Sequence, residues 1–222
     1  MCYSANASFW SAVILAVLGT VSLHQTKLWS LRMFAAIPLL FAFQQLAEGI
    51  VWLTIDHPTN FAHTPAIYMF LFFALIVWPT WLPISLLLAE KKTRARICLA
   101  LLACAGLAVS GYAIMMLGQS TPSVHIGARS LCYDFASPAN SWLQALCLVG
   151  YCIPTLVPFF VATLAYAPFL GIAAIIALGA TLAFKFVAFT SVWCFFAAIL
   201  SVLVIISVMI QQHRIKNEQD KS

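Results

Sequence analysis

Charged side chains are scarce in this chain of 222 residues. Only 8% of its residues are charged and only six are acidic, whereas soluble domains carry about 25% charged residues. Hydrophobic residues make up 64% of the chain, and the mean hydropathy is +1.00. These values exclude an ordinary soluble domain and predict an integral membrane protein.

Long polar segments are missing as well. The longest loop that we expect, residues 118–140, is too short to hold a second domain. We also find no self-similar halves of the kind that build many transporters. We therefore expect one membrane domain over residues 1–222, with a short mobile tail at 212–222.

Apolar runs fill most of the chain. A spanning helix needs about 20 mostly apolar residues, because the hydrocarbon core of a bilayer is about 30 Å thick. The sequence predicts an all-α bundle of seven transmembrane helices, at Ser4–Leu23, Met33–Ile55, Ala66–Leu88, Ile97–Leu117, Ser141–Ala162, Ala167–Phe184 and Val187–Ile210. The first of them has no basic n-region and no clear cleavage site, so we expect it to be retained.

Basic residues gather on one side of this predicted bundle. Loops rich in Lys and Arg stay in the cytoplasm. With the N-terminus outside, nine of the eleven basic residues lie on the cytoplasmic side: Lys27, Arg32, Lys91, Lys92, Arg94, Arg96, Arg214, Lys216 and Lys221. The sequence thus predicts an outer N-terminus and a cytoplasmic C-terminus. The net charge of +5 follows from this asymmetry, so we expect the lipid bilayer and no nucleic acid as a partner.

Familiar histidine and cysteine patterns are also absent. No CxxC motif or Cys/His metal spacing occurs. None of the five histidines lies inside a predicted span, which sets aside a resemblance to membrane hydrolases that carry an HxxxH pair within their spans. Lys185 precedes the last predicted span, whereas a retinal protein needs a lysine in the middle of its last helix. Cys2 and Cys132 are both predicted on the outer side, so they can form a disulfide if that compartment is oxidising.

One of the few acidic residues, Glu48, falls within the second predicted span, in QQLAEGIVW. An ionised side chain at the bilayer centre costs at least about 2.5–3.5 kcal/mol, and such residues usually face a bundle interior. Helical spacing places four side chains on one broad face: Gln44, Gln45, Glu48 and Trp52. We expect Glu48 to be protonated, to pair with a cation or to bind a ligand. Lys185 is the one cation predicted near the same leaflet.

Cys194 lies about seven residues into the last predicted span, and therefore at about the depth of Glu48 at 1.5 Å per residue. Trp193 precedes it, and Cys2 and His125 lie on the outer side above it. The candidate ligand-binding residues are Glu48, Cys194, Cys2, Gln44, Gln45, Trp52, His125, Lys185 and Trp193. The candidate metal ligands among them are Cys2, Glu48, His125 and Cys194, a set that favours a soft or borderline transition metal.

Three motifs carry a resemblance to a known family. The opening MCYSANASF, the helix QQLAEGIVW and the run SVWCFFAA resemble an uncharacterised domain-of-unknown-function family of small bacterial membrane proteins, with an MCxSAxAS start, a QxxEGxVW helix and an SxWCxxAA end. The residues that match its pattern are Cys2, Ser4, Glu48, Trp52, Ser191, Trp193 and Cys194. The resemblance implies seven spans in a bacterial inner (plasma) membrane, and it implies no reaction. Phe196 replaces a tryptophan of the pattern, and the run after His125 departs from it, so no role for His125 follows.

Three classes of function stay open. The first is a polytopic membrane protein whose outward-facing intramembrane polar site binds a metal ion, a cofactor or a small solute. The second is a membrane-embedded enzyme with Cys194 or Cys2 as nucleophile and Glu48 or His125 as proton-transfer group. The third is a structural or assembly subunit of a membrane complex. The inner half of the bundle is nearly bare of polar residues, which favours a one-sided site over a path through the membrane.

Overall fold

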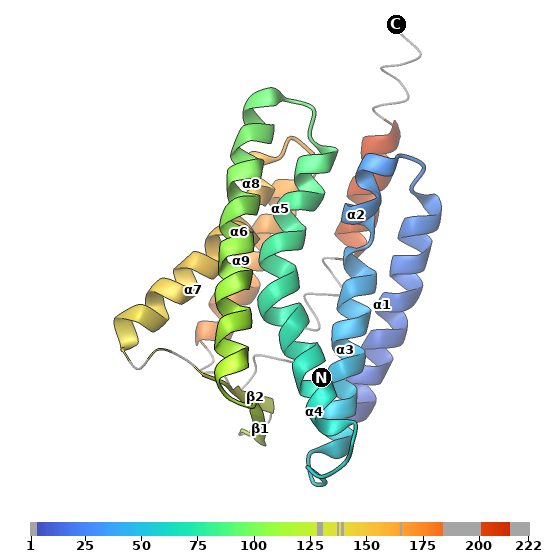
Figure 1. Cartoon of the computed structure of the whole chain (residues 1–222). Coiled ribbons are helices and arrows are strands. Elements are labelled where there is room, and N and C mark those ends of the chain that lie inside the picture. Colours follow the sequence, from blue (N-terminus) through green and yellow to red (C-terminus); the bar gives the residue numbers. More distant parts are fainter. Residues whose placement is uncertain are drawn as a thin grey trace, which may run out of the picture.

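A computed structural model describes residues 4–127, 131–136, 138, 140–164, 166–183 and 201–213. Four of the predicted site residues lie outside the described residues: Cys2, Lys185, Trp193 and Cys194. The described chain is almost entirely helical (Figure 1). This confirms the helical class that the apolar runs predict.

Five helical segments are long and apolar enough to cross a membrane. They are α1 (Ala5–Gln25); η1 (Trp29–Leu31), α2 (Arg32–Ala35) and α3 (Ile37–Thr54); α4 (His63–Leu71), η2 (Phe72–Val77) and α5 (Trp78–Ala89); α6 (Thr93–Gln119); and α7 (Ser141–Leu156) with α8 (Pro158–Val161). Two shorter apolar helices follow, α9 (Ala167–Ala183) and the helical residues Ser201–His213. The seven-span count therefore stays a prediction.

The helices run up and down, so their connections gather at two ends (Figure 1). The α3–α4 loop and a small hairpin lie at one end, and the connections after α1 and α5 lie at the other. Gln212 joins this second end, because its side chain accepts a hydrogen bond from the Lys27 backbone N–H (2.6 Å) and donates one to the Gln25 carbonyl (3.2 Å). The C-terminal helix thus ends beside the basic loops.

Close helix packing depends on small residues at two crossings. A Cβ atom at Gly19 of α1 would lie 2.7 Å from the Leu39 backbone nitrogen of α3. At Gly106 of α6, a Cβ atom would collide with the Pro79 carbonyl oxygen of α5. In both places the obstacle is backbone, which cannot rotate away. Glycine is therefore required for the α1–α3 and α5–α6 contacts.

A π-helical turn, η2, precedes Pro79 in the third span. Pro79 has no N–H, so it cannot donate to the Ala74 carbonyl five residues earlier. The Tyr151 hydroxyl of α7 takes that place and donates to the Ala74 carbonyl at 2.6 Å. The Ser110 hydroxyl of α6 donates to the Ile76 carbonyl at 2.8 Å. The irregular turn is thus held by neighbouring helices, which satisfy its carbonyl groups.

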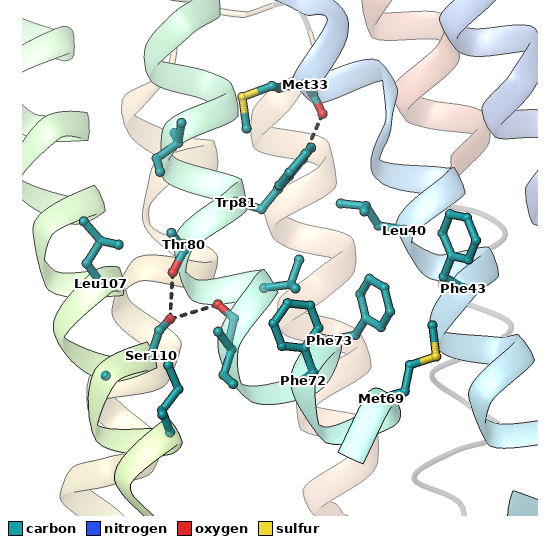
Figure 2. A pocket seen from close by; sticks show the side chains of 15 residues that line it. Met33, Leu40, Phe43, Met69, Phe72, Phe73, Thr80, Trp81, Leu107 and Ser110 are labelled. Carbon is teal, nitrogen blue, oxygen red and sulfur yellow. Dashed lines mark hydrogen bonds between the residues drawn. The ribbon is translucent and has the colours of Figure 1, made fainter. Parts of the chain in front are cut away.

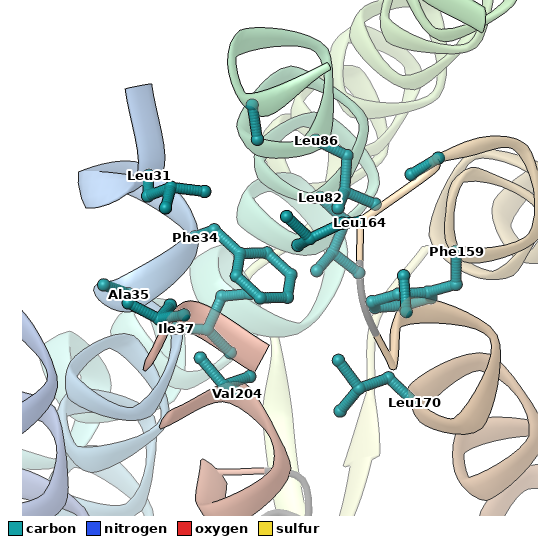
Figure 3. Packing of buried hydrophobic residues seen from close by; sticks show 14 of the residues in the cluster. Leu31, Phe34, Ala35, Ile37, Leu82, Leu86, Phe159, Leu164, Leu170 and Val204 are labelled. Carbon is teal, nitrogen blue, oxygen red and sulfur yellow. The ribbon is translucent and has the colours of Figure 1, made fainter. Parts of the chain in front are cut away.

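An apolar cluster ties the second span to the C-terminal helices. Figure 3 shows Phe34 of α2 among Leu82 and Leu86 of α5, with Val204 and Leu170 on the other sides. Phe34 and Leu86 are completely buried. A second cluster lies at the hairpin end and consists of Ala47, Val51, Ala66, Ile67, Phe70, Leu71, Leu117 and Leu131. The candidate site borders this second cluster.

Two features differ from the sequence-based expectations. The loop at 118–140 contains an antiparallel hairpin, β1 (Ser123–Ile126) paired with β2 (Leu131–Asp134). Strands of four residues are too short to give a clear alternating pattern, so no hairpin was expected. α4 begins at His63, three residues before the expected span at Ala66, and α1 extends to Gln25, so His63 and His24 lie in helical segments that could cross a membrane. The early start of α4 follows from a contact across the α3–α4 loop, described below.

Candidate functional site

The polar face of α3 points into the bundle, as its spacing predicts. Gln44 is 3% exposed, Gln45 is 1% exposed and Glu48 is 0% exposed. Trp52, one turn beyond Glu48, is half-buried. The helix interior leaves its own N–H groups bonded along the helix, so a carboxyl at position 48 can be served only by side chains or by a bound molecule.

The two glutamines of this face have different tasks. The Gln44 side-chain oxygen accepts a hydrogen bond from the Trp78 indole N–H at 2.8 Å. The Trp78 ring also stacks on Phe41, with 4.1 Å between ring centroids. Gln44 therefore anchors the start of α5 to α3. The Gln45 side chain instead hydrogen-bonds the Glu48 carboxyl, which holds Glu48 at the centre of the face.

The hairpin adds a phenol to this face. Tyr133 of β2 stacks on Phe70 of α4, with 4.4 Å between ring centroids and an interplanar angle of 7°. Burial raises the pKa of the Tyr133 phenol well above its usual range, and a negative charge on Glu48 raises it further. Tyr133 thus lies within electrostatic reach of Glu48. The sequence indicates Tyr133 only as one of several polar residues near Glu48's end of the bundle, because its place beside Glu48 depends on the hairpin.

Two buried hydrogen-bond donors of this site are unused. The Trp52 indole N–H and the Tyr133 hydroxyl are buried, and neither has a hydrogen-bond partner among the described residues. An unsatisfied buried donor costs about 1–3 kcal/mol, and such groups are rare in native proteins. Two such donors beside one buried carboxyl make this face the candidate site among the described residues.

His125 lies on the other face of the hairpin. Its Nδ1 is 2.7 Å from an Asp134 carboxylate oxygen, and the two side chains are 59% and 62% exposed. Side chains alternate along a strand, so His125 and Asp134 project away from the face that carries Tyr133. Cys132 is the cross-strand partner of His125. The described structure therefore brings Gln44, Gln45, Glu48 and Trp52 together and leaves His125 apart from them.

A second polar contact closes the C-terminal end of α3. The Thr54 hydroxyl donates to the Ile50 carbonyl at 2.8 Å, and His63 Nδ1 lies 2.9 Å from the same hydroxyl oxygen. A hydroxyl has one proton, so His63 Nδ1 must be the donor in this pair. The buried His63 therefore joins the first residue of α4 to the last turn of α3, which explains the early start of α4.

No three His, Cys, Asp or Glu side chains come close enough to hold a metal ion within the part of the chain that the structure describes. Of the four predicted metal ligands, the structure describes Glu48 and His125. Glu48 lies on the polar face of α3, and His125 lies on the hairpin face that points away from Tyr133. Cys2 and Cys194 lie outside the described residues. Their contribution to a metal site, or to an enzyme with a cysteine nucleophile, stays a prediction.

A family model matches residues 1–220, nearly the whole chain. The chain belongs to DUF6629, a family of unknown function. The family resemblance that the three motifs indicate is thereby confirmed. No curated protein and no solved structure matches the chain.

Two of the three motifs of this DUF6629 chain meet in the structure. Ser4, in the opening motif, caps α1 by accepting a hydrogen bond from the Ala7 N–H at 3.4 Å. Phe9 closes that motif, and a Cβ atom at Gly49 of the second motif would lie 2.8 Å from the Phe9 ring. The glycine beside Glu48 therefore makes room for the first motif. The third motif lies outside the described residues.

Proposed function

We propose that this protein is a seven-span membrane protein that binds a small polar solute at an outward-facing site around Glu48. The observation that carries the proposal is the pair of buried, unused donors on Trp52 and Tyr133, next to a buried carboxyl. Such a site suits a solute with at least two acceptor oxygens or nitrogens, since each donor then gains a partner.

The donor set favours a solute over a metal ion. An indole N–H donates a hydrogen bond and has no lone pair to offer a metal. The carboxyl of Glu48 and the two donors on Trp52 and Tyr133 can instead form three hydrogen bonds to one polar solute. Binding of a soft or borderline metal would require the thiols of Cys2 and Cys194 beside Glu48. Elemental analysis of the purified protein distinguishes the two ligands.

The orientation of the proposal rests on charge. Lys27 lies in the connection after α1, and Arg32 and Arg96 lie in the first turns of α2 and α6 at the same end of the bundle. The hairpin lies at the other end (Figure 1). The positive-inside rule assigns the basic end to the cytoplasm. In a bacterial inner membrane, the site around Glu48 then opens to the outside. The N-terminus lies outside and the C-terminus lies in the cytoplasm.

Thiol labelling in intact cells tests this orientation. In a variant with all seven native cysteines replaced by serine, Thr59→Cys and Ser120→Cys place single thiols at the hairpin end, and Thr93→Cys places one at the basic end. We expect a membrane-impermeant reagent to label the first two and to spare the third until the membrane is opened. Labelling of Thr93→Cys alone would put the site on the cytoplasmic side.

Solute release from purified protein tests the site. We expect mass spectrometry of the denatured wild type to find a small polar compound in near-stoichiometric amount. Tyr133→Phe removes one donor and keeps the ring, so it should lower the occupancy about tenfold, which corresponds to about 1.4 kcal/mol. His125→Gln, on the other face of the same hairpin, is the matched control and should retain the compound. Wild-type protein that releases no compound, or only a metal ion, contradicts the proposal.

A further inference from the structure

An apolar groove of about 720 Å³ runs along the outside of the bundle (Figure 2), and none of the residues of the α3 polar face lines it. Its walls are α2 and α3 on one side and α6 on the other, and η2 and α5 form its floor. Figure 2 shows Met33, Leu40, Phe43 and Met69 facing Leu107 across the groove. This volume lies within the range of about 300–1,000 Å³ that ligand sites occupy.

The few polar groups in the wall are already bonded to one another. Ser110 donates to the Ile76 carbonyl, so the Thr80 hydroxyl donates to the Ser110 oxygen at 2.7 Å. The Trp81 indole N–H donates to the Met33 carbonyl at 2.9 Å. The wall therefore offers a ligand hydrocarbon contacts along its length. A polar solute would lose its hydration there without compensation, whereas an alkyl chain would not.

The length and depth of the groove suit a lipid tail. Its lining extends along the third span from Met69 to Ile84, which corresponds to about 22 Å at 1.5 Å per residue. A hydrocarbon core of about 30 Å gives each leaflet about 15 Å. One acyl chain can therefore lie in the groove over the full depth of its own leaflet.

A basic residue, Arg32, lies next to the lining residue Met33 in the chain, at the basic end of the bundle. Arg32 immediately precedes Met33 and is exposed, and its guanidinium carbon lies 4.8 Å from the Trp29 ring centroid. No carboxylate pairs with Arg32 in the described ranges. Tryptophan and arginine are typical of the membrane interface, and a guanidinium can bind phosphate through two N–H groups.

We propose that the groove binds an anionic phospholipid, with one acyl chain between α3 and α6 and the head-group phosphate on Arg32. The positive charge of Arg32, beside the Met33 end of the apolar groove, favours an anionic lipid over a zwitterionic one. This inference does not depend on the solute site around Glu48. The bound lipid belongs to the leaflet at the basic end of the bundle.

Gly111 of α6 offers a way to fill the groove without disturbing the fold. A Cβ atom at Gly111 would meet no described atom within 4 Å, and Gly111 lines the groove. Gly118 is the matched control, because it lies on the same helix, also has open space around its Cβ position and does not line the groove. Arg94, an exposed basic residue at the same end of the bundle, is the control for Arg32.

The experiment is native mass spectrometry of protein exchanged into bilayers with equal amounts of phosphatidylglycerol and phosphatidylcholine of identical chains. We expect the wild type and Gly118→Phe to retain one phospholipid, mainly phosphatidylglycerol. Gly111→Phe should lower the retained lipid at least about tenfold. Arg32→Gln should keep the lipid and lose the head-group preference, and Arg94→Gln should keep both. Gly111→Leu repeats the test if the phenylalanine variant unfolds in detergent.

Three outcomes overturn the proposal. Equal lipid retention by Gly111→Phe and the wild type would show that the groove holds no bound chain. Loss of a dimer in Gly111→Phe, with lipid unchanged, would assign the groove to a second copy of the chain. If Arg32→Gln keeps the preference for phosphatidylglycerol, Arg32 does not bind the head-group phosphate.

Discussion

Two buried glutamates of this protein have opposite surroundings. Glu90, 4% exposed, lies in the loop after α5, where it accepts hydrogen bonds from the backbone N–H groups of Lys91 and Lys92, both at 2.9 Å. It also accepts from the Thr163 N–H at 2.6 Å and the Thr163 hydroxyl at 2.8 Å. Glu48, completely buried, lies in the middle of α3 beside the unused donors of Trp52 and Tyr133.

The difference follows from the backbone. A loop leaves N–H groups without helical partners, so Glu90 can collect them and join the α5–α6 loop to the segment between α8 and α9. A helix interior consumes its own N–H groups. Glu48 therefore depends on side chains or on a ligand. Glu90 thus stabilises the fold, whereas the surroundings of Glu48 support the proposed solute site.

Replacing Glu90 with alanine should have the largest effect on stability. The change leaves the Thr163 N–H and two loop N–H groups without their acceptor and opens the contact between residues 90 and 163. We expect the free energy of unfolding to fall by about 3 kcal/mol, measured by denaturant unfolding in detergent. Asp56→Ala, in the exposed α3–α4 loop, is the control and should change little. A loss no larger than that of the control would make Glu90 dispensable.

The pH dependence of stability should also trace to Glu90. Burial works to raise the pKa of this carboxyl, but the hydrogen bonds from Lys92, Thr163 and Lys91 outweigh burial and lower the pKa below 4.5. A carboxyl whose pKa is lower in the folded state stabilises the fold above its unfolded pKa. That contribution is lost as the pH falls through the folded pKa. The stability difference between wild type and Glu90→Gln should therefore be full near pH 6 and shrink below pH 4.5. A difference that grows on acidification would contradict this assignment.

The sequence predicts one member of this comparison and not the other. Helical spacing alone places Gln44, Gln45 and Glu48 on a buried face, because a costly charge within a span requires an interior position. Nothing near Glu90 indicates Thr163, which lies 73 residues away along the chain. Local sequence does not predict the position of Tyr133 either, since that position requires the hairpin to fold back on α4. Local pattern thus predicts which helix face is buried, and the tertiary fold decides what meets it.

Replacing Glu48 should separate shape from charge. Glu48→Ala removes the acceptor of the Gln45 side chain and leaves a cavity, so we expect a loss of about 1–3 kcal/mol in the free energy of unfolding. Glu48→Gln keeps the shape, so its unfolding should differ little from the wild type while the amount of bound solute falls. Unfolding measurements paired with mass spectrometry of the released solute check both. A Glu48→Gln variant that retains the full amount of solute would class Glu48 with Glu90 as a structural residue.

Tyr133→Phe should have the smallest effect on stability, and it tests the solute site most directly. The substitution keeps the ring that stacks on Phe70 and removes a buried hydroxyl that has no partner in the described structure. Deleting an unsatisfied polar group is nearly neutral or stabilising, so in solute-free protein the free energy of unfolding should stay equal or rise by up to about 1 kcal/mol. Added solute should then stabilise the wild type more than the variant, since the variant lacks one donor. Thermal unfolding with and without the released compound measures this difference. A variant that is clearly less stable than the wild type without solute would show that the hydroxyl already has a structural partner, and Tyr133 would leave the site.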